Sequence, residues 1–361
     1  MERTIQLSLL EKTLSGIKPA YEESKMKAKE RLDNQAKPLG SLGQLEEIAI
    51  KLAGVTGNIK NKIDKKCIIV MSADNGIVEE GVSSCPQNIT AIQTINFIRG
   101  VTGVGVLAKH AGASLKVVDI GINADITYPG LVNRKIRKST SNMSKGPAMS
   151  RQEAIKALEI GIETVSELAK EGYNILGTGE MGIGNTSTSS AIVMAFTGCS
   201  AEFAVGKGAG LTEEGFENKK KVINKALETN KPDKNDPIDV LAKVGGFDIG
   251  GMAGCFIGAA YYRIPILIDG FISAAAALLA YRLNPMVTHY MFPSHCSAEL
   301  GYKEIMEELK FKPYLNLEMR LGEGTGCALA FNVMEAANAI ITNMATFEEA
   351  SIVNDYLIDI R

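Results

Sequence analysis

Glu323 has the most unusual setting of any carboxylate in the sequence. It lies between Gly322 and Gly324 in the stretch LEMRLGEGTGCA (residues 317–328), with Arg320 just before it and a run of small residues after it. Glycine gives the backbone its widest conformational range and provides no side-chain cover. A carboxylate placed there is open to a ligand and can accept a proton or stabilise positive charge. Glu323 is therefore the first candidate for a chemical role.

A second carboxylate, Glu180, lies inside the glycine-rich turn LGTGEMGIGNTS (residues 176–187). The turn follows an apolar run, precedes a helical pattern and matches the dinucleotide-binding pattern G-x-G-x-x-G at Gly177, Gly179 and Gly182. Glu180 would repel a pyrophosphate in this turn. A single phosphate fits better, held by backbone N–H groups at a helix start that Asn185 or Thr186 would cap. The alternative is a tight turn whose glycines serve packing alone.

A second glycine-rich turn, VGKGAG (residues 205–210), ends the next apolar run. Its lysine adds a positive charge that glycine spacing alone does not require. Two adjacent turns of this kind suit a phosphorylated ligand that bridges neighbouring strands, and an exposed lysine on an ordinary turn is the alternative. The P-loop pattern G-x-x-x-x-G-K-[ST] does not occur, which excludes a P-loop nucleotidase. The candidate phosphate-binding residues of the two turns are Gly182, Gly184, Asn185, Gly206, Lys207 and Gly208.

The other polar clusters are expected to be structural. Asp74 begins an Asp-Asn-Gly turn after the first apolar run, and such a turn is common without any catalytic role. His295 stands next to Cys296, but nothing in the sequence places them as base and nucleophile. The six cysteines are scattered without a C-x-x-C pair, and only three histidines are present, so no zinc site is predicted.

Composition is typical of an ordinary soluble globular protein. The chain has 361 residues, of which 45% are hydrophobic and 22% charged, and a net charge of -2. It carries no basic stripe for nucleic acid. The N-terminus does not resemble a signal peptide, and the most apolar run, residues 264–281, is interrupted by Asp269 and Gly270, so it predicts a buried strand, a turn and a helix. We expect a cytoplasmic protein with reduced thiols and no membrane or nucleic-acid partner.

The elements that position these residues follow an α/β pattern. Short apolar runs alternate with helical patterns, which predicts a doubly wound, mostly parallel sheet covered by helices on both faces. The predicted strands lie within residues 67–76, 115–123, 173–182, 201–210 and 264–271. Ligands bind at the carboxyl ends of the strands in such sheets, where the polar turns gather. Capping boxes are expected at Ser41 with Gln44 and at Ser150 with Glu153.

The domain organisation is predicted from a change in texture along the chain. Residues 67–292 form the α/β core, whereas residues 1–66 and 293–361 are mainly helical in pattern. We expect these two end segments to pack together as a small helical lobe on the core. The lobe would contribute the loop that carries Glu323.

Several segments, in order along most of the chain, resemble one enzyme family. They are KPLGSLGQLE, SADNGIVEEGVSSCPQNITAIQ, GEMGIGNTS, VGKGAGL, GGFDIGGMAG, ILIDGFISAAAAL, PSHCSAELGY and LEMRLGEGTGCALA. The last is the most specific. The sequence is similar to nicotinate-nucleotide:dimethylbenzimidazole phosphoribosyltransferases, which act in cobalamin biosynthesis. The resemblance implies transfer of phosphoribose from nicotinate mononucleotide to 5,6-dimethylbenzimidazole, giving α-ribazole phosphate and nicotinate, without a cofactor or metal.

The resemblance also implies roles for individual residues. Glu323 matches the family's general base and Glu180 its second active-site carboxylate, while Gly182 and the turn GKGAG match its phosphate-binding segments. The slot for the aromatic base falls on Cys85, Gln93, Met181 and Leu321. Some relatives use adenine, other benzimidazoles or phenols, so the sequence leaves the preferred acceptor open. The resemblance further suggests a homodimer with each site near the partner.

Two other functions remain as alternatives at this stage. A dinucleotide-binding oxidoreductase would rest on the three glycines of the G-x-G-x-x-G pattern. A non-catalytic nucleotide-binding protein would keep the phosphate-binding turns and leave Glu323 without a role.

Overall fold

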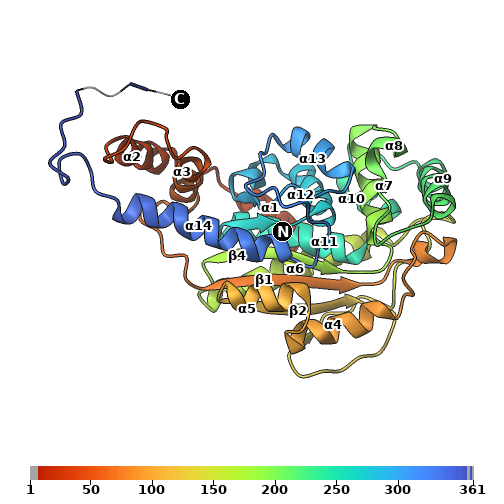
Figure 1. Cartoon of the computed structure of the whole chain (residues 1–361). Coiled ribbons are helices and arrows are strands. Elements are labelled where there is room, and N and C mark those ends of the chain that lie inside the picture. Colours follow the sequence, from red (N-terminus) through yellow and green to blue (C-terminus); the bar gives the residue numbers. More distant parts are fainter. Residues whose placement is uncertain (1–6, 356–357, 360–361) are drawn as a thin grey trace, which may run out of the picture.

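The centre of the fold is a six-stranded parallel sheet. The computed structural model describes residues 7–355, 358 and 359 (Figure 1). The strands are paired in the order β3-β2-β1-β4-β5-β6, and every pairing is parallel. The predicted α/β class with a doubly wound sheet is confirmed. The strands are β1 (Lys66–Ala73), β2 (Ala113–Gly121), β3 (Leu131–Asn133), β4 (Ile175–Met181), β5 (Ile266–Ile268) and β6 (Met291–Pro293).

The direction of strand addition reverses between β1 and β4. From β1 the chain adds β2 and then β3 on one side, and from β4 it adds β5 and β6 on the other. Open α/β sheets bind ligands at such a switch point, outside the carboxyl ends of the strands. Met71 of β1 pairs with Glu180 of β4, so Glu180 lies at that edge.

Helices cover both faces of the sheet. On one face α11 (Phe247–Tyr262) packs against the central strands and is backed by α6 (Arg151–Lys170), whose predicted capping box at Ser150 and Glu153 is confirmed. The two helices can approach closely because Gly161 has no side chain. A Cβ atom there would lie only 2.0 Å from the carbonyl oxygen of Gly251. The other face carries α4 (Ile89–Arg99), α5 (Gly103–His110) and α14 (Thr325–Asn343).

Helices from the N-terminal and C-terminal parts of the chain lie side by side next to the sheet (Figure 1). Helices α2 (Glu22–Asp33) and α3 (Gln44–Thr56) pack against α14, and the Gln35 amide nitrogen donates to the carbonyl oxygen of Ile340 at 2.7 Å. By contrast, α1 (Leu9–Gly16) packs on α6 and α11, and α13 (Gly301–Leu309) packs on α7 (Asn185–Thr197) and α12 (Phe271–Leu283). The division into a core and a lobe of both end segments stays a prediction.

The remaining elements connect these layers. The helices among them are α7 (Asn185–Thr197), α8 (Ala201–Ala204), α9 (Glu213–Asn230), α10 (Pro237–Val244) and α12 (Phe271–Leu283). Two short 3-10 helices are η1 (Gly76–Glu80) and η2 (Pro285–His289).

Two local predictions are wrong. Residues 201–210 form the short helix α8 and a loop instead of a strand, since Ala, Glu and Phe with a single β-branched valine favour a helical turn as much as a strand. Helix α3 begins at Gln44 with Gly43 as its N-cap, so Ser41 does not cap it. Gly43 has a positive φ of +52°, so the chain turns there, directly before Gln44 and after Ser41. The predicted capping box did not include this turn.

One stretch, Ile89–His110, is long and apolar enough by composition to cross a membrane, and a third of it is buried in the protein. It is two helices, because Gly100 at φ +70° ends α4 and the Thr102 side chain caps α5. The run at residues 264–281 forms β5, a turn and α12, as predicted.

Candidate active site

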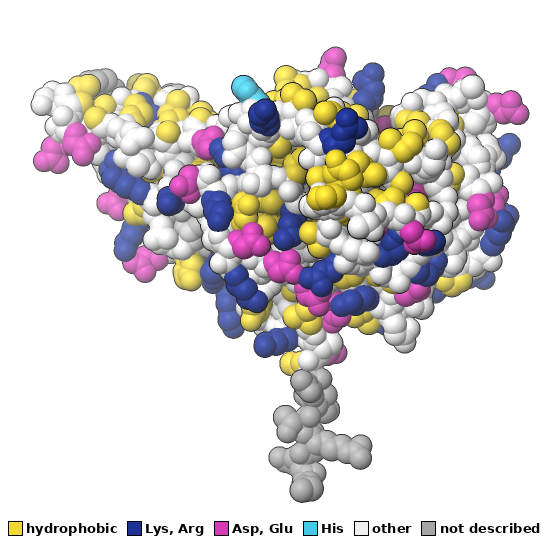
Figure 2. All heavy atoms as spheres, turned by 90° about the horizontal axis from the view of Figure 1, so that it is seen from below, with side chains coloured by type: hydrophobic (Ala, Val, Ile, Leu, Met, Phe, Trp, Pro, Cys, Tyr) yellow, Lys and Arg dark blue, Asp and Glu magenta, His cyan; other side chains and the backbone are white. Residues whose placement is uncertain are grey.

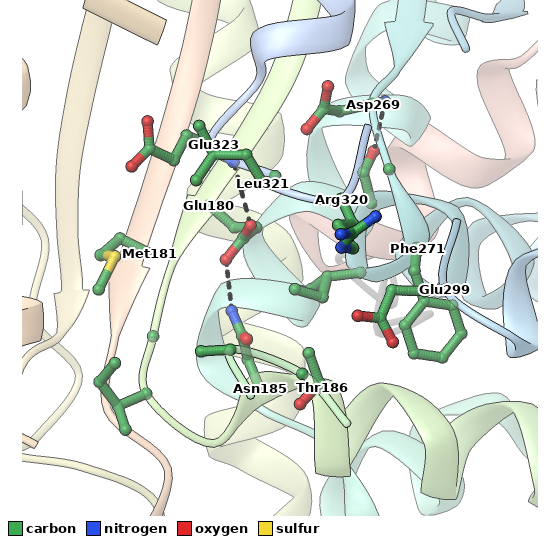
Figure 3. A pocket seen from close by; sticks show the side chains of 18 of the residues that line it. Glu180, Met181, Asn185, Thr186, Asp269, Phe271, Glu299, Arg320, Leu321 and Glu323 are labelled. Atoms are coloured by element: carbon green, nitrogen blue, oxygen red, sulfur yellow. Dashed lines mark hydrogen bonds between the residues drawn. The ribbon is translucent and has the colours of Figure 1, made fainter. Parts of the chain in front are cut away.

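A cavity of about 300 Å³ opens at the carboxyl edge of the sheet, next to the switch point. Its walls come from the end of β4, the starts of α7 and α12, the helix α4 and the loop before α14 (Figure 3). Both glycine-flanked carboxylates, Glu180 and Glu323, line it. The structure therefore brings together residues that are 143 positions apart in the chain.

The Glu323 carboxylate is held by hydrogen bonds from helices α4 and α5. One of its carboxylate oxygens accepts a hydrogen bond from the Gln93 amide at 2.9 Å, and the other faces the backbone nitrogen of Val104 at 3.3 Å. The side chain is buried, with 6% exposure. Val104 belongs to the first turn of α5, whose positive dipole end favours a carboxylate. No pattern in the sequence indicates that α5 takes part.

The glycines of β4 allow the Glu323 loop and α14 to lie directly on the strand. A Cβ atom at Gly179 would lie 2.2 Å from the carbonyl oxygen of Glu323, and one at Gly177 would lie 2.7 Å from the Cβ of Cys327. At Gly182 it would lie 2.2 Å from the backbone oxygen of Ala73. Close packing thus accounts for the G-x-G-x-x-G pattern without a bound pyrophosphate.

Glu180 lies between the Glu323 loop and a second buried acid. It accepts a hydrogen bond from the backbone nitrogen of Glu323 at 3.2 Å and another from the Asn185 amide (Figure 3). The same Asn185 amide nitrogen also donates to Asp248 at 3.1 Å. Burial, followed by the nearby Asp248 charge, raises the pKa of Glu180 to about 8, and burial raises the pKa of Asp248 to about 7. Two carboxylates on one amide favour retention of a proton.

Helix capping by Asn185 or Thr186 is not observed. Gly184, at φ +91°, is the N-cap of α7, and neither side chain caps the helix. Asn185 binds the two carboxylates, and the Thr186 hydroxyl accepts a hydrogen bond from Lys219. Both side chains therefore orient charged neighbours, Asn185 the carboxylates of Glu180 and Asp248 and Thr186 the amine of Lys219.

Lys219 is a buried cation that contacts the cavity wall through Thr186, and the sequence patterns did not reveal it. Its amine donates to the Thr186 hydroxyl at 2.8 Å and to the carbonyl oxygen of Gly206 at 3.0 Å. Its side chain is fully buried, and desolvation lowers its pKa to about 8. Lys219 begins a run of three lysines in the polar helix α9, and nothing in that run distinguishes the buried residue from its neighbours.

Lys207 is placed differently from its predicted role. It is exposed, forms an ion pair with Glu213 and is not among the cavity-lining residues. Gly208 does line the cavity, and Gly206 contributes the carbonyl group that holds Lys219. The second glycine turn therefore reaches the site through its backbone and a lysine from α9.

The four predicted base-slot residues all line the same cavity. Cys85 and Gln93 come from the segment around the start of α4, Met181 ends β4, and Leu321 precedes the loop that carries Glu323. Leu321 is 59% exposed, which places it at the mouth. Apolar walls with a few polar groups suit a flat aromatic ligand.

Asp74 and His295, for which structural roles are expected, both have hydrogen-bond partners within the protein. Asp74 accepts hydrogen bonds from the Thr90 hydroxyl at 2.7 Å and from the backbone nitrogen of Asn123 at 2.8 Å. His295 is buried against the Ser294 hydroxyl, whereas Cys296 is exposed. Within residues 7–355, 358 and 359, no three His, Cys, Asp or Glu side chains are grouped so as to hold a metal ion.

Comparison with known proteins identifies the family. A family model described as Phosphoribosyltransferase matches residues 17–352. The nicotinate-nucleotide–dimethylbenzimidazole phosphoribosyltransferase of Acetivibrio thermocellus is 56% identical over 344 residues, which are 95% of this chain and 98% of that protein. The chain belongs to this phosphoribosyltransferase family. The resemblance seen in the sequence is confirmed.

Other members of the family agree with this assignment. The protein of the same name from Clostridium acetobutylicum is 56% identical over 343 residues, covering 95% of this chain and 97% of that protein. The crystal structure of CobT from Thermus thermophilus matches with a TM-score of 0.89 and 37% identity, over 92% of this chain and 99% of that one. This phosphoribosyltransferase fold extends over nearly the whole chain.

Proposed function

We propose that the protein transfers phosphoribose from nicotinate mononucleotide to 5,6-dimethylbenzimidazole or a related aromatic base. The products are α-ribazole 5′-phosphate and nicotinate, and the reaction serves cobalamin biosynthesis. The observation that carries the proposal is one cavity lined by a carboxylate and an apolar slot, with a buried lysine that donates to Thr186 in its wall. These groups suit, in turn, an acidic N–H, an aromatic ring and a phosphate. Relatives that are 56% identical carry this activity in their names.

The reaction requires one proton acceptor. The unprotonated ring nitrogen of the benzimidazole attacks C1′ of the ribose, and the bond from C1′ to the nicotinate nitrogen breaks with its electron pair going to the departing ring. The new product ring is cationic until its other nitrogen loses a proton. Glu323 accepts that proton, and its charge stabilises the ring while the cation develops.

The leaving group needs no acid. Nicotinate is a pyridinium in the substrate and departs as a neutral ring, so a single base is sufficient. A single displacement also inverts C1′, which requires the acceptor and the departing nicotinate to lie on opposite faces of the ribose. The acceptor side is then the slot of Cys85, Met181 and Leu321, next to Glu323.

The phosphate of the nucleotide binds at the two glycine turns. Lys219 supplies the positive charge, backbone N–H groups around Gly182 and Gly184 supply donors at the start of α7, and the backbone of Gly208 lines the same cavity. Lys219 is already oriented by the Thr186 hydroxyl and the carbonyl group of Gly206. A preformed cation loses little side-chain freedom when the phosphate arrives.

Glu180 has two roles in this proposal. It accepts a hydrogen bond from the backbone of Glu323, which orients the catalytic loop, and it faces the cavity near the ribose. The developing charge on the ribose and the pyridinium of the substrate both favour its ionised form. Substrate binding would therefore lower the raised pKa of Glu180.

The two alternative functions have less support. A dinucleotide-binding oxidoreductase rested on three glycines that close packing explains. A non-catalytic protein would not require Glu323 to hold hydrogen bonds from both α4 and α5 at the edge of the slot.

We also propose that the enzyme is a cytoplasmic homodimer. Ile92 on α4, Val101 on the link between α4 and α5, and Val106 on α5 are 50%, 61% and 59% exposed, respectively. The same segment contributes Gln93 to the wall of the cavity. Figure 2 shows hydrophobic side chains grouped among charged ones on the face that carries these helices. A second copy would cover such apolar area and the nearby Leu321. All six cysteines are free thiols, which agrees with a reducing compartment.

The direct test is nicotinate release from nicotinate mononucleotide, with 5,6-dimethylbenzimidazole, adenine and a phenol offered separately. Release that depends on one acceptor is expected, and the Glu323→Gln variant should lose about 100- to 10,000-fold in kcat while it still binds the nucleotide. An unchanged kcat in Glu323→Gln would contradict the assigned base. Tight nucleotide binding by the wild type without release for any acceptor would favour the non-catalytic alternative.

A further inference from the structure

The loop that carries Glu323 has a backbone conformation that must be held in place. Gly322, Glu323 and Gly324 have φ values of +80°, +65° and +101°. Glycine adopts this left-handed region freely, but an L-residue such as glutamate does so at a cost in energy. A catalytic carboxylate on such a segment keeps its position only where the surrounding contacts determine the backbone.

Asp269 makes the closest of these contacts. It follows β5 directly and is 1% exposed. One carboxylate oxygen accepts a hydrogen bond from the backbone nitrogen of Gly324 at 2.9 Å, and the other accepts from Gly326 at 2.7 Å. These two N–H groups belong to the N-terminal end of α14, where a negative charge is favourable. Asp269 thus takes the place of a capping side chain that α14 lacks.

Every backbone N–H from Glu323 to Gly326 has a partner. Glu323 donates to Glu180, and Thr325 donates to the carbonyl oxygen of Gly322. Gly324 and Gly326 both donate to Asp269. Asp269 is therefore the group that holds the residue directly after Glu323 and fixes that residue to the helix.

We propose that Asp269 is a positioning residue for Glu323: it fixes the left-handed loop so that the Glu323 carboxylate lies at the edge of the acceptor slot. This inference rests on the proposed function. Asp269 acts through the backbone of residues 324–326, and Glu323 alone receives the proton. The signature ILIDGF thereby acquires a role that neither phosphate binding nor the acceptor slot requires.

The arrangement requires a carboxylate at position 269. Asparagine has the same shape but one acceptor oxygen, so its NH₂ group would face the N–H of either Gly324 or Gly326. His295 limits adjustment of the loop, because a Cβ atom at Gly326 would lie 1.9 Å from its Nδ1 atom. The hydroxyl of Ser273 accepts a hydrogen bond from the backbone nitrogen of Asp269 at 3.1 Å and so helps to hold the backbone of Asp269 in place.

The first test is a double-mutant cycle on the full chain. Asp269→Asn should lower kcat for 5,6-dimethylbenzimidazole by about 10- to 100-fold, the loss expected from a small misplacement of a catalytic group. The Kd of nicotinate mononucleotide by calorimetry should change by less than about 3-fold. In a Glu323→Gln background the same substitution should cost less than about 2-fold, because the residue it positions is already disabled. Additive losses would overturn the proposal.

The matched control is Glu335→Gln. Glu335 also belongs to α14 and pairs with the buried Lys66, far along the helix from the loop. Its loss should lower the melting temperature while leaving kcat within about 2-fold of the wild type. If Glu335→Gln lowered kcat as much as Asp269→Asn, general loosening of α14 would explain both results and the positioning role would be refuted.

A second measurement is independent of turnover. Amide hydrogen exchange of peptides covering residues 322–328 should be at least about 10-fold faster in Asp269→Asn, and unchanged in Glu335→Gln. Asp269→Ser serves in the same way where the asparagine variant does not fold. Unchanged exchange would overturn the inference while leaving the proposed function intact, whereas a wild type without acceptor-dependent release but with protected peptides would refute the function alone.

Discussion

The replacement of Lys219 by methionine tests the phosphate site against the role predicted for Lys207. Lys219→Met keeps the apolar stem and removes the buried charge that is held by Thr186 and Gly206. A hydrogen bond to a charged group contributes about 1.5 to 3 kcal/mol. The Kd of nicotinate mononucleotide should therefore rise roughly 10- to 150-fold. Lys207→Met removes an exposed ion pair and should change this Kd by less than about 3-fold.

The pH dependence of binding gives an independent measure of the same residue. Desolvation lowers the pKa of Lys219 to about 8 in the free protein. Above that pH the amine is neutral, so the affinity of the wild type for nicotinate mononucleotide should decrease between about pH 7.5 and 9.5. The phosphate is a dianion over this range and contributes no change of its own. Lys219→Met should lack the decrease.

Isothermal titration calorimetry of both variants at about pH 7.5 and 9.5 decides between the two lysines. Circular dichroism melting controls for folding, since Lys219 also joins α9 to the Gly206 turn. A larger loss of affinity in Lys207→Met than in Lys219→Met would refute the geometric reasoning. It would mean that the glycine turn rearranges and brings the exposed lysine to the phosphate.

Two further outcomes are expected. Burial raises the pKa of Glu180 to about 8. The contribution of its neutral form to the stability of the folded protein is therefore fully present below the ordinary pKa near 4.5 and is lost as pH rises through 8. In calorimetric melting, the melting temperature should fall less between about pH 5 and pH 9 for Glu180→Gln than for the wild type. An equal fall in both proteins would contradict the raised pKa. Val106→Glu should shift the mass measured by light scattering from dimer to monomer, and an unchanged mass would reject this face as the interface.

The sheet could be predicted from the sequence because its strands are continuous apolar runs. The run of β1 is buried along its whole length, as expected for a strand covered on both faces. Strands β3 and β6 were missed because each has only three residues and no longer apolar run around it, whereas the equally short β5 lies within the apolar run at residues 264–271. Residues 201–210 were predicted as a strand because an apolar run there ends in a glycine turn, but the four-residue helix α8 occupies the start of that segment.

The chemical groups were predictable only where glycine marks them. Glu180 and Glu323 stand in glycine-rich segments, and both line the cavity. Lys219 lies in a charged helix, and Asp248 and Asp269 stand at the ends of apolar segments where a single acid also fits an ordinary turn or helix start. Their roles depend on which backbone groups the tertiary fold brings to them, and that information is not local in the sequence.

The glycines of β4 and the acids around the Glu323 loop solve one packing problem. The proposed general base, Glu323, must reach the central strand at the switch point, yet its loop leads directly into α14, which packs on one face of the sheet. Bare strand positions at Gly177 and Gly179 let α14 and the loop approach β4 within backbone contact. Such close approach leaves little room for water on the buried N–H groups, so carboxylates must bind them. Glu180 and Asp269 do so, which is why a G-x-G-x-x-G pattern occurs here beside acids that a pyrophosphate site would exclude.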